Sequence, residues 1–118
     1  MNAVSDMAAS LLEALRGVDG LRVSMDTGGT VSPPEAVLHP PTLVWDAFVS
    51  TPTTATFTAS LVVAADDRAM ERLWDRLPAV TEAVDTVPDA VVVRATPGTF
   101  TSGGAQLPAY LLTIEVSL

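Results

Sequence analysis

Residues 100–118 read FTSGGAQLPAYLLTIEVSL, a glycine turn followed by a pattern typical of a β-strand. Every second residue from Tyr110 to Leu118 is apolar, so one face of this strand is suited to a hydrophobic core. Chain ends usually fray unless other segments hold them. We therefore expect this strand to be held by pairing with other strands of a sheet. The segments that precede it must supply those strands.

Hydrophobic periodicity predicts those preceding elements. An apolar stripe at helical spacing follows Ser5, which can cap a helix that ends before Gly17. Alternation or extended character predicts strands in LRVSMD (21–26), in the segment 35–50 with a bend at its Pro-Pro pair, in TFTASLVV (56–63) and in AVVVRAT (90–96). Glycines and prolines predict a loop over residues 26–34, whose role stays open, and a loop or bulged hairpin over residues 97–104.

A second, longer helix is predicted to begin after Asp66 or Asp67, either of which can cap it, and to end at VPD (87–89). Pro78 lies inside this helix and removes one backbone hydrogen bond, so we expect a kink there. The apolar stripe of this helix comprises Met70, Leu73, Trp74, Leu77, Val80 and Val84. The predicted order, α-β-β-β-α-β-β, indicates an α+β fold: a mostly antiparallel or mixed sheet of about five strands with two helices packed on one face.

The composition bounds the size and the environment of the protein. The chain has 118 residues, of which 48% are hydrophobic, and its mean hydropathy is +0.38. This length predicts a single domain over residues 1–118. No apolar run approaches the roughly 18 residues that a membrane-spanning helix needs, and the first residues lack a secretion signal. We expect the surplus apolar surface to be buried in the core and against other protein chains.

The charge balance disfavours nucleic acid as a ligand. Fourteen acidic residues stand against six arginines, with no lysine, for a net charge of −8. Affinity for a polyanion rests largely on Lys and Arg, so a chain this acidic is a poor candidate. The absence of cysteine means that neither a disulfide nor a thiolate site is expected.

Residue types able to carry catalysis are scarce. His39 is the only histidine, and no glycine-flanked serine elbow accompanies it. Gly98 and Gly103 are spaced as in a phosphate loop, but the lysine and hydroxyl residue that should follow are absent. Helix capping explains Asp66 and Asp67 more simply than metal binding does. No catalytic, cofactor-binding or metal-binding residue is therefore predicted, and we do not expect an enzyme.

The polar side of the second helix carries two rows of charge. The acidic row is Asp67, Glu71 and Asp75, and the basic row is Arg68, Arg72 and Arg76. The pairs Arg68–Glu71 and Arg72–Asp75 are three residues apart, so they can meet, each worth a few tenths of a kcal/mol. Such a face is either solvated or meets a complementary strip on a neighbouring subunit.

Three aromatic residues outside the helices are further interface candidates. Trp45 and Phe48 fall on opposite faces of one predicted strand, so one of them leaves the core. Phe100 lies in a predicted loop, where it is hard to bury locally. Each of the three is suited either to core packing or to an interface, where buried aromatics carry much of the binding energy. An interface role for Phe100 predicts that Phe100→Asp abolishes assembly and spares the monomer fold.

Three stretches of running sequence, together with the order of elements, point to one family. They are PPTLVW (40–45), LVVAADDRAMERLWDRLPAVTEAVDTVPDAVV (61–92) and PGTFTSGGAQLPAYLLTIEVSL (97–118). In these stretches the chain resembles tail terminator proteins of long-tailed, siphovirus-type bacteriophages, notably those that infect actinobacteria. The resemblance covers about residues 33–118, and the absence of lysine fits such a phage genome.

The resemblance implies a structural virion protein with neither cofactor nor catalysis. Members of this family form a ring, typically of six copies, on the last ring of the tail tube. The ring stops tube polymerisation and presents a surface for joining the tail to the head. The implied partners are copies of itself, the tail tube protein and the head-tail connector or stopper protein. Double-stranded DNA passes through without specific binding, and no membrane is involved. The implied location is the head-proximal end of the virion tail, and the host cytoplasm during assembly.

Two alternatives fit the same residues. One is another neck or minor tail protein that joins heads to tails. The other belongs to a different class, a small, non-catalytic ligand-binding α+β domain. An isolated globular domain with a deep polar cleft and no exposed apolar surface would overturn the ring-forming interpretation.

Overall fold

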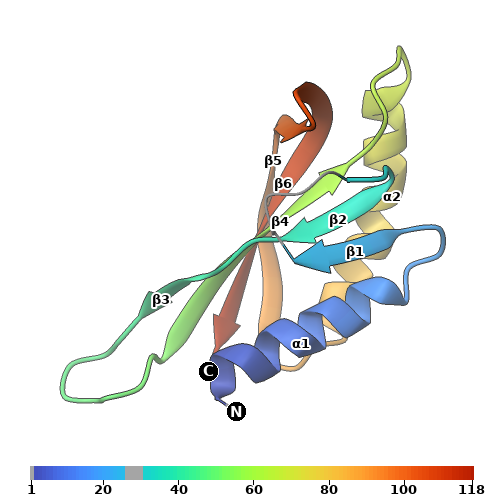
Figure 1. Cartoon of the computed structure of the whole chain (residues 1–118). Helices are drawn as coiled ribbons and strands as arrows, with labels where there is room; N and C mark the ends of the chain where they lie inside the picture. The colour runs from blue at the N-terminus through green and yellow to red at the C-terminus, as the bar shows by residue number, and fades with distance from the viewer. Residues whose placement is uncertain (1, 26–30) are drawn as a thin grey trace.

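The computed structural model describes residues 2–25 and 31–118 as a mixed β-sheet with two helices (Figure 1). Its elements are α1 (Ala3–Arg16), β1 (Arg22–Met25), β2 (Glu35–Leu38), β3 (Thr42–Val44), β4 (Thr54–Val62), α2 (Ala69–Asp85), β5 (Ala90–Ser102) and β6 (Ala105–Ser117). The α+β class and the predicted order are confirmed, with one extended segment divided in two. Most of the loop predicted over residues 26–34 lies outside the described residues.

The last strand lies inside the sheet and not at its edge. The strand order is β1-β2-β4-β6-β5, and β3 pairs with the start of β4. β1 and β2 are parallel, and every other pair is antiparallel. β6 therefore pairs with β4 on one side and β5 on the other, and the Leu118 N–H donates to the Thr53 carbonyl at 3.0 Å. Pairing on both sides therefore holds the last strand in the sheet, as its sequence pattern predicts.

Both helices pack on one face of the sheet, and the hydrophobic core lies between the two layers. The register sets Phe57 opposite Ile114 and Ala59 opposite Leu112, so alternate residues of β4 and β6 point toward the helices. The largest fully buried residues of this core are Phe57, Leu11, Leu15, Leu38, Leu61, Leu73, Leu112, Ile114, Val80 and Val84. The alternation predicted for the last strand is confirmed. In β4 the predicted alternation holds as far as Ala59, whereas Ser60 and Val62, predicted on the outer face, are buried as well.

The extended segment predicted over residues 35–50 forms two strands and part of a loop. β2 ends before Pro40–Pro41, which supplies no backbone donors to a ladder, and β3 then runs for 3 residues. The described residues therefore form a six-stranded sheet instead of one of about five strands. Because β3 stops at Val44, the prediction that Trp45 and Phe48 lie on opposite faces of one strand is wrong.

The helices begin differently from the sequence-based expectation. Asn2, and not Ser5, caps α1: its Oδ1 accepts the Ser5 backbone N–H at 2.8 Å. Asp66 accepts the backbone N–H of Arg68 at 2.8 Å, but the helical residues of α2 start only at Ala69. Asp66 thus shapes the turn that leads into α2 and does not occupy the N-cap position itself.

The buried stripe of α2 is narrower than predicted. Helix α2 continues through Pro78 to Asp85, and Leu73 is buried against the sheet as expected. Met70 and Trp74 are exposed, so the prediction that they belong to the core stripe is wrong. Both lie at the border of the stripe, where the helix surface turns away from the sheet. Within residues 2–25 and 31–118, no helix is long and apolar enough to cross a membrane.

The β5–β6 hairpin is longer than predicted, because β5 continues to Ser102 and the turn is only Gly103–Gly104. Both glycines have positive φ, which suits a tight turn. The end of the hairpin curls (Figure 1), and the ring centroids of Phe100 and His39 lie 6.2 Å apart. Ser102 Oγ accepts the Val31 N–H at 2.9 Å. Of the two forms predicted for residues 97–104, a loop or a bulged hairpin, the structure has a hairpin, and Phe100 lies in its curled strand β5.

Candidate protein–protein interface

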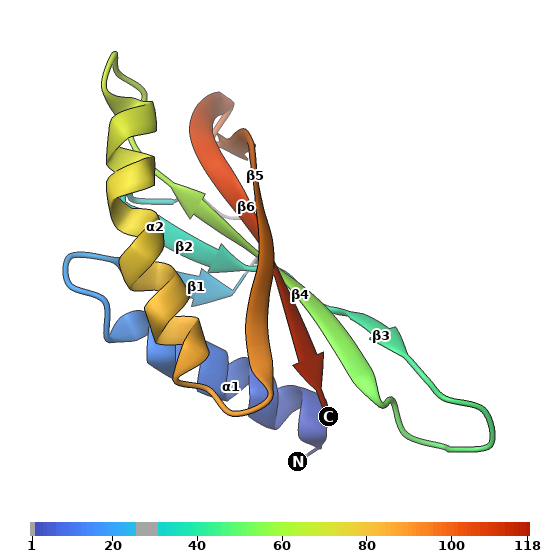
Figure 2. The same ribbon diagram turned by 180° about the vertical axis from the view of Figure 1, so that it is seen from behind.

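The segment around β3 projects from the rest of the domain (Figure 2). We define this arm as residues 42–54, comprising β3, the following loop and the first residue of β4. Its large exposed apolar side chains are Val44, Trp45, Phe48 and Val49. Single exposed apolar residues are common on protein surfaces, whereas several on one projecting segment indicate an interaction site. The arm is therefore the first candidate interface.

The tip of the arm holds Phe48 in an unusual backbone conformation. Its φ is 69°, in the left-handed region that bulky residues rarely adopt, and its side chain is fully exposed. Trp45 Nε1 donates to the Ser50 carbonyl at 3.3 Å, and the Thr53 N–H donates to the Val44 carbonyl at 2.9 Å. These bonds across the arm brace its tip. Backbone strain held by surrounding structure is concentrated at functional sites.

A largely apolar cavity lies between the start of α1 and the base of the arm. We call it the base cavity; its volume is about 620 Å³. Residues from both elements line it, including Ala3, Val4, Leu43, Trp45, Pro52 and Leu118. The volume falls within the range of roughly 300–1,000 Å³ that is usual for binding pockets. The cavity can therefore accept a large apolar group.

The exposed side of α2 presents a second apolar surface. We call Met70 and Trp74 the α2 patch; their side chains are 37% and 55% exposed. Trp74 Nε1 donates a hydrogen bond of 2.8 Å to the Tyr110 hydroxyl on β6. This bond fixes the indole orientation, so less conformational entropy is lost when a partner covers it. Sequence reasoning missed this patch because it assigned both residues to the core.

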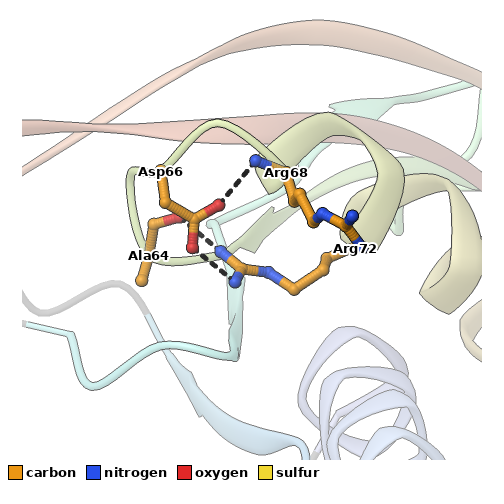
Figure 3. Close-up of polar contacts among 4 residues, drawn as sticks. All are labelled: Ala64, Asp66, Arg68 and Arg72. Carbon is orange, nitrogen blue, oxygen red and sulfur yellow. Dashed lines mark hydrogen bonds and ion pairs between the residues drawn. The ribbon is translucent and has the colours of Figure 1, made fainter.

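Polar contacts fix the turn between β4 and α2 (Figure 3). Arg72 donates to Asp66 Oδ2 at 2.6 Å and to the Ala64 carbonyl at 2.8 Å. The backbone N–H of Arg68 donates to Asp66 Oδ1. That N–H, followed by the Arg72 guanidinium, holds the pKa of the Asp66 carboxyl below its usual value of 3.8. Arg72 is therefore engaged within its own chain.

The two charged rows of α2 are arranged differently from the prediction. Arg76 Nη1 donates to the Asp19 carbonyl at 3.3 Å, so a second arginine is also bonded within the chain. Among the described residues, neither predicted pair of this helix, Arg68–Glu71 or Arg72–Asp75, comes within ion-pair distance. The other members of the rows are exposed to solvent: Asp67, Arg68, Glu71 and Asp75. Their role in an interface stays a prediction.

The predicted interface residues are thus distributed over three places. Trp45 and Phe48 lie on the arm, the charged rows lie on α2, and Phe100 lies on the curled hairpin. Phe100 is only partly exposed, and its ring faces His39, so it is less available to a partner than the arm is. Residues 43–49 are apolar on both alternating faces apart from Asp46, and one core cannot bury both faces. That pattern is the sequence signal for the arm.

The polar groups inside the described parts of the chain serve the fold. His39 Nε2 lies 2.8 Å from Ser60 Oγ, and the buried Glu35 accepts from Ser24 Oγ at 2.6 Å and from the Ser32 N–H at 3.0 Å. Over residues 2–25 and 31–118, no group of three or more His, Cys, Asp and Glu residues could hold a metal ion.

Comparison with known proteins gives a fold relationship. No protein-family model matches the chain, and no curated protein matches it in sequence. Its architecture, a mixed sheet with both helices on one face, occurs in a bacteriophage protein. That protein is bacteriophage SPP1 gp17, whose structure matches with a TM-score of 0.56 over 98% of this chain and 91% of gp17, at 12% sequence identity. At this identity the match shows a shared fold.

Proposed function

We propose that this protein is a tail terminator of a long-tailed bacteriophage. In this role, copies of the chain form a ring on the end of the tail tube, stop its polymerisation and present a surface for joining the tail to the head. The observation that carries the proposal is the arm, a segment that projects from the domain and carries four large exposed apolar side chains. A single copy leaves this surface in water, so the arm is suited to a protein partner.

Two further observations support the same role. The fold is shared with bacteriophage SPP1 gp17, and this match supports a bacteriophage origin for the chain. The running-sequence resemblance to tail terminators covers about residues 33–118, which include the arm, α2 and the β5–β6 hairpin. The fold match supports a bacteriophage protein, and the resemblance supports the terminator role within that class.

The proposed role divides the surfaces between partners. A closed ring requires a head-to-tail contact in which one surface of each copy meets a different surface of the next. We assign the arm to this contact. The α2 patch and the exposed charges beside it are then free for the tail tube protein or the head-tail connector. A net charge of −8 per copy disfavours binding of the ring to DNA that passes through it.

The decisive experiment removes the protein during phage assembly and examines the particles by electron microscopy. Loss of a terminator leaves tube growth unchecked, so we expect tails of uncontrolled length that do not join filled heads. Normal tails that fail to join would contradict the terminator role and favour another neck protein. Complementation with wild-type protein should restore tails of one length, whereas Phe48→Asp, which places a charge on the arm tip, should not.

A further inference from the structure

We propose that Phe48 at the arm tip of one copy enters the base cavity of the next copy. This contact rests on the proposed ring-forming function and assigns both of its sides. The donor is the exposed tip of the arm, and the acceptor is the cavity between α1 and the arm base. Because the two sides differ, the contact is heterologous and propagates from copy to copy until a ring closes.

The donor side is preformed. Phe48 is fully exposed at a left-handed φ of 69°, and the Trp45 indole bonds across the tip to the Ser50 carbonyl. A side chain presented in this way loses little backbone freedom when it is buried. Aromatic residues that fill a pocket at the centre of an interface commonly dominate its binding energy.

The acceptor side matches the donor in polarity and size. The base cavity combines apolar groups of Val4, Leu43 and Leu118 in a volume of about 620 Å³. That volume exceeds one phenyl ring, so it leaves room for a neighbour of Phe48 such as Val49. The copy's own Phe48 is fully exposed, so the cavity is not filled by its own arm tip.

Charge complementarity favours a second copy as the occupant. Asp46 is exposed on the arm, two residues before Phe48. The cavity includes Ala3 and Ser5 in the first turn of α1, where the helix macrodipole is positive. Insertion of the tip brings the Asp46 carboxylate to this end of the helix. Asp6, the acidic residue of the same turn, does not line the cavity.

The test uses one variant on each side of the contact. Phe48→Gly removes the phenyl ring and suits a positive φ, so the fold is retained. Ala3→Glu places a carboxylate in the cavity at a helix start, where an acid is compatible with folding. The matched control is Ala9→Glu, which adds the same charge to the exposed side of α1 outside the cavity. Circular dichroism confirms that each variant folds.

Self-association is measured by analytical ultracentrifugation of the purified chain over a wide concentration range. We expect each contact variant to lose more than about 30-fold in association affinity, while Ala9→Glu behaves as wild type. In a mixture, the intact tip of Ala3→Glu enters the intact cavity of Phe48→Gly. The mixture should therefore form a one-to-one heterodimer of 2 × 12.3 = 24.6 kDa and assemble no further.

The outcomes separate this contact from the function on which it rests. Wild-type assembly with undiminished association of both variants would overturn the contact and leave the ring intact. Loss of assembly in both variants without heterodimer formation would also overturn it, because the two lesions would not be complementary. A wild-type chain that stays monomeric at every concentration, and also on purified tail tubes, would remove the ring and the contact together.

Discussion

The indole Nε1 of Trp74 on α2 donates a 2.8 Å hydrogen bond to the hydroxyl of Tyr110 on β6. This bond joins an exposed helix residue to a strand of the sheet interior. It explains how a tryptophan that is 55% exposed can keep one orientation instead of moving freely. Trp74 is therefore the ordered residue of the α2 patch, which reduces the entropy lost when a partner covers it.

Removal of the Tyr110 hydroxyl tests how much its hydrogen bond with Trp74 contributes to the free energy of unfolding. Tyr110→Phe keeps the ring and leaves the Trp74 N–H to water, so the free energy of unfolding should fall by about 0.5–1.5 kcal/mol. Urea unfolding followed by circular dichroism measures the change. In a Trp45→Phe background, where Trp74 is the sole indole, the fluorescence anisotropy of the variant should decay faster, because the indole moves more freely. An unchanged anisotropy decay would show that packing alone orders Trp74.

The Asp66 carboxylate should make stability depend on pH at the acidic end. The Arg68 N–H and the Arg72 guanidinium lower its pKa in the folded state. Its contribution is therefore complete above the unfolded pKa of 3.8 and is lost as pH falls through the lower folded pKa. Asp66→Asn keeps an acceptor for the N–H but loses the ion pair with Arg72. The variant should be less stable than wild type at neutral pH, and the difference should shrink in acid.

The matched control for this pH series is Asp67→Asn, which removes the same charge from the next residue. Urea unfolding is measured from neutral pH to about pH 2, a range that spans the titration of Asp. Asp67→Asn should follow the wild-type profile more closely than Asp66→Asn does. A constant difference between Asp66→Asn and wild type down to the lowest pH would show that the carboxylate charge is not what stabilises the turn.

The strands whose pattern repeats every second residue were predictable. In β4 and β6, one face meets the helices, so the alternation around Phe57 and Ile114 reflects burial directly. The arm was not predictable in the same way. The apolar residues on both faces of segment 43–49 fit an extended chain, but they do not show where strand pairing ends, and β3 pairs with only the first residues of β4. Pairing partners are a property of tertiary structure.

The candidate site was predictable only in part, for similar reasons. A helical stripe identifies Leu73 and Trp74 alike as apolar, but the width of the layer beneath α2 decides that only Leu73 is covered. Helical spacing also suggests Asp75 as the partner of Arg72. The observed partner, Asp66, lies in the turn before the helix, where sequence spacing does not fix the geometry. The base cavity is formed by segments distant in sequence and has no local signal.

Relief of backbone strain at the arm tip gives a stability prediction separate from assembly. A left-handed conformation costs a residue with a Cβ atom roughly 1–2 kcal/mol. Phe48→Gly relieves this strain, but it also makes the unfolded chain more flexible. The free energy of unfolding of Phe48→Gly should therefore be at least equal to that of wild type. Phe48→Ala removes the ring but keeps the Cβ atom, so it should be the less stable variant by about 0.5–1 kcal/mol.

Thermal and urea unfolding of both Phe48 variants are compared at concentrations where the wild type is monomeric, because assembly would add stability to the wild type alone. Equal stability of the glycine and alanine variants would mean that the tip relaxes in solution to a conformation with negative φ. The arm tip would then not be preformed.

Phe100 should contribute to the stability of the monomer, whatever its role in assembly. Its ring faces His39 from the curled end of the hairpin and is only partly exposed. Full burial of a large apolar side chain is worth about 1.5–3 kcal/mol. Because Phe100 is only partly buried, Phe100→Ala should lower the free energy of unfolding by about 1–2 kcal/mol. Phe100→Asp should cost more, since it places a charge beside the sheet, whereas a pure interface role predicts that the monomer fold is spared.

The control for Phe100 is Val91→Ala on the same strand, where the side chain is 48% exposed and the loss should be smaller. Ring-current shifts of the His39 protons in NMR spectra report the contact directly and should vanish in Phe100→Ala. If instead the variant keeps its stability and its His39 shifts but fails to assemble, Phe100 acts on a neighbouring subunit. The hairpin curl would then be held chiefly by the bond between Ser102 and Val31.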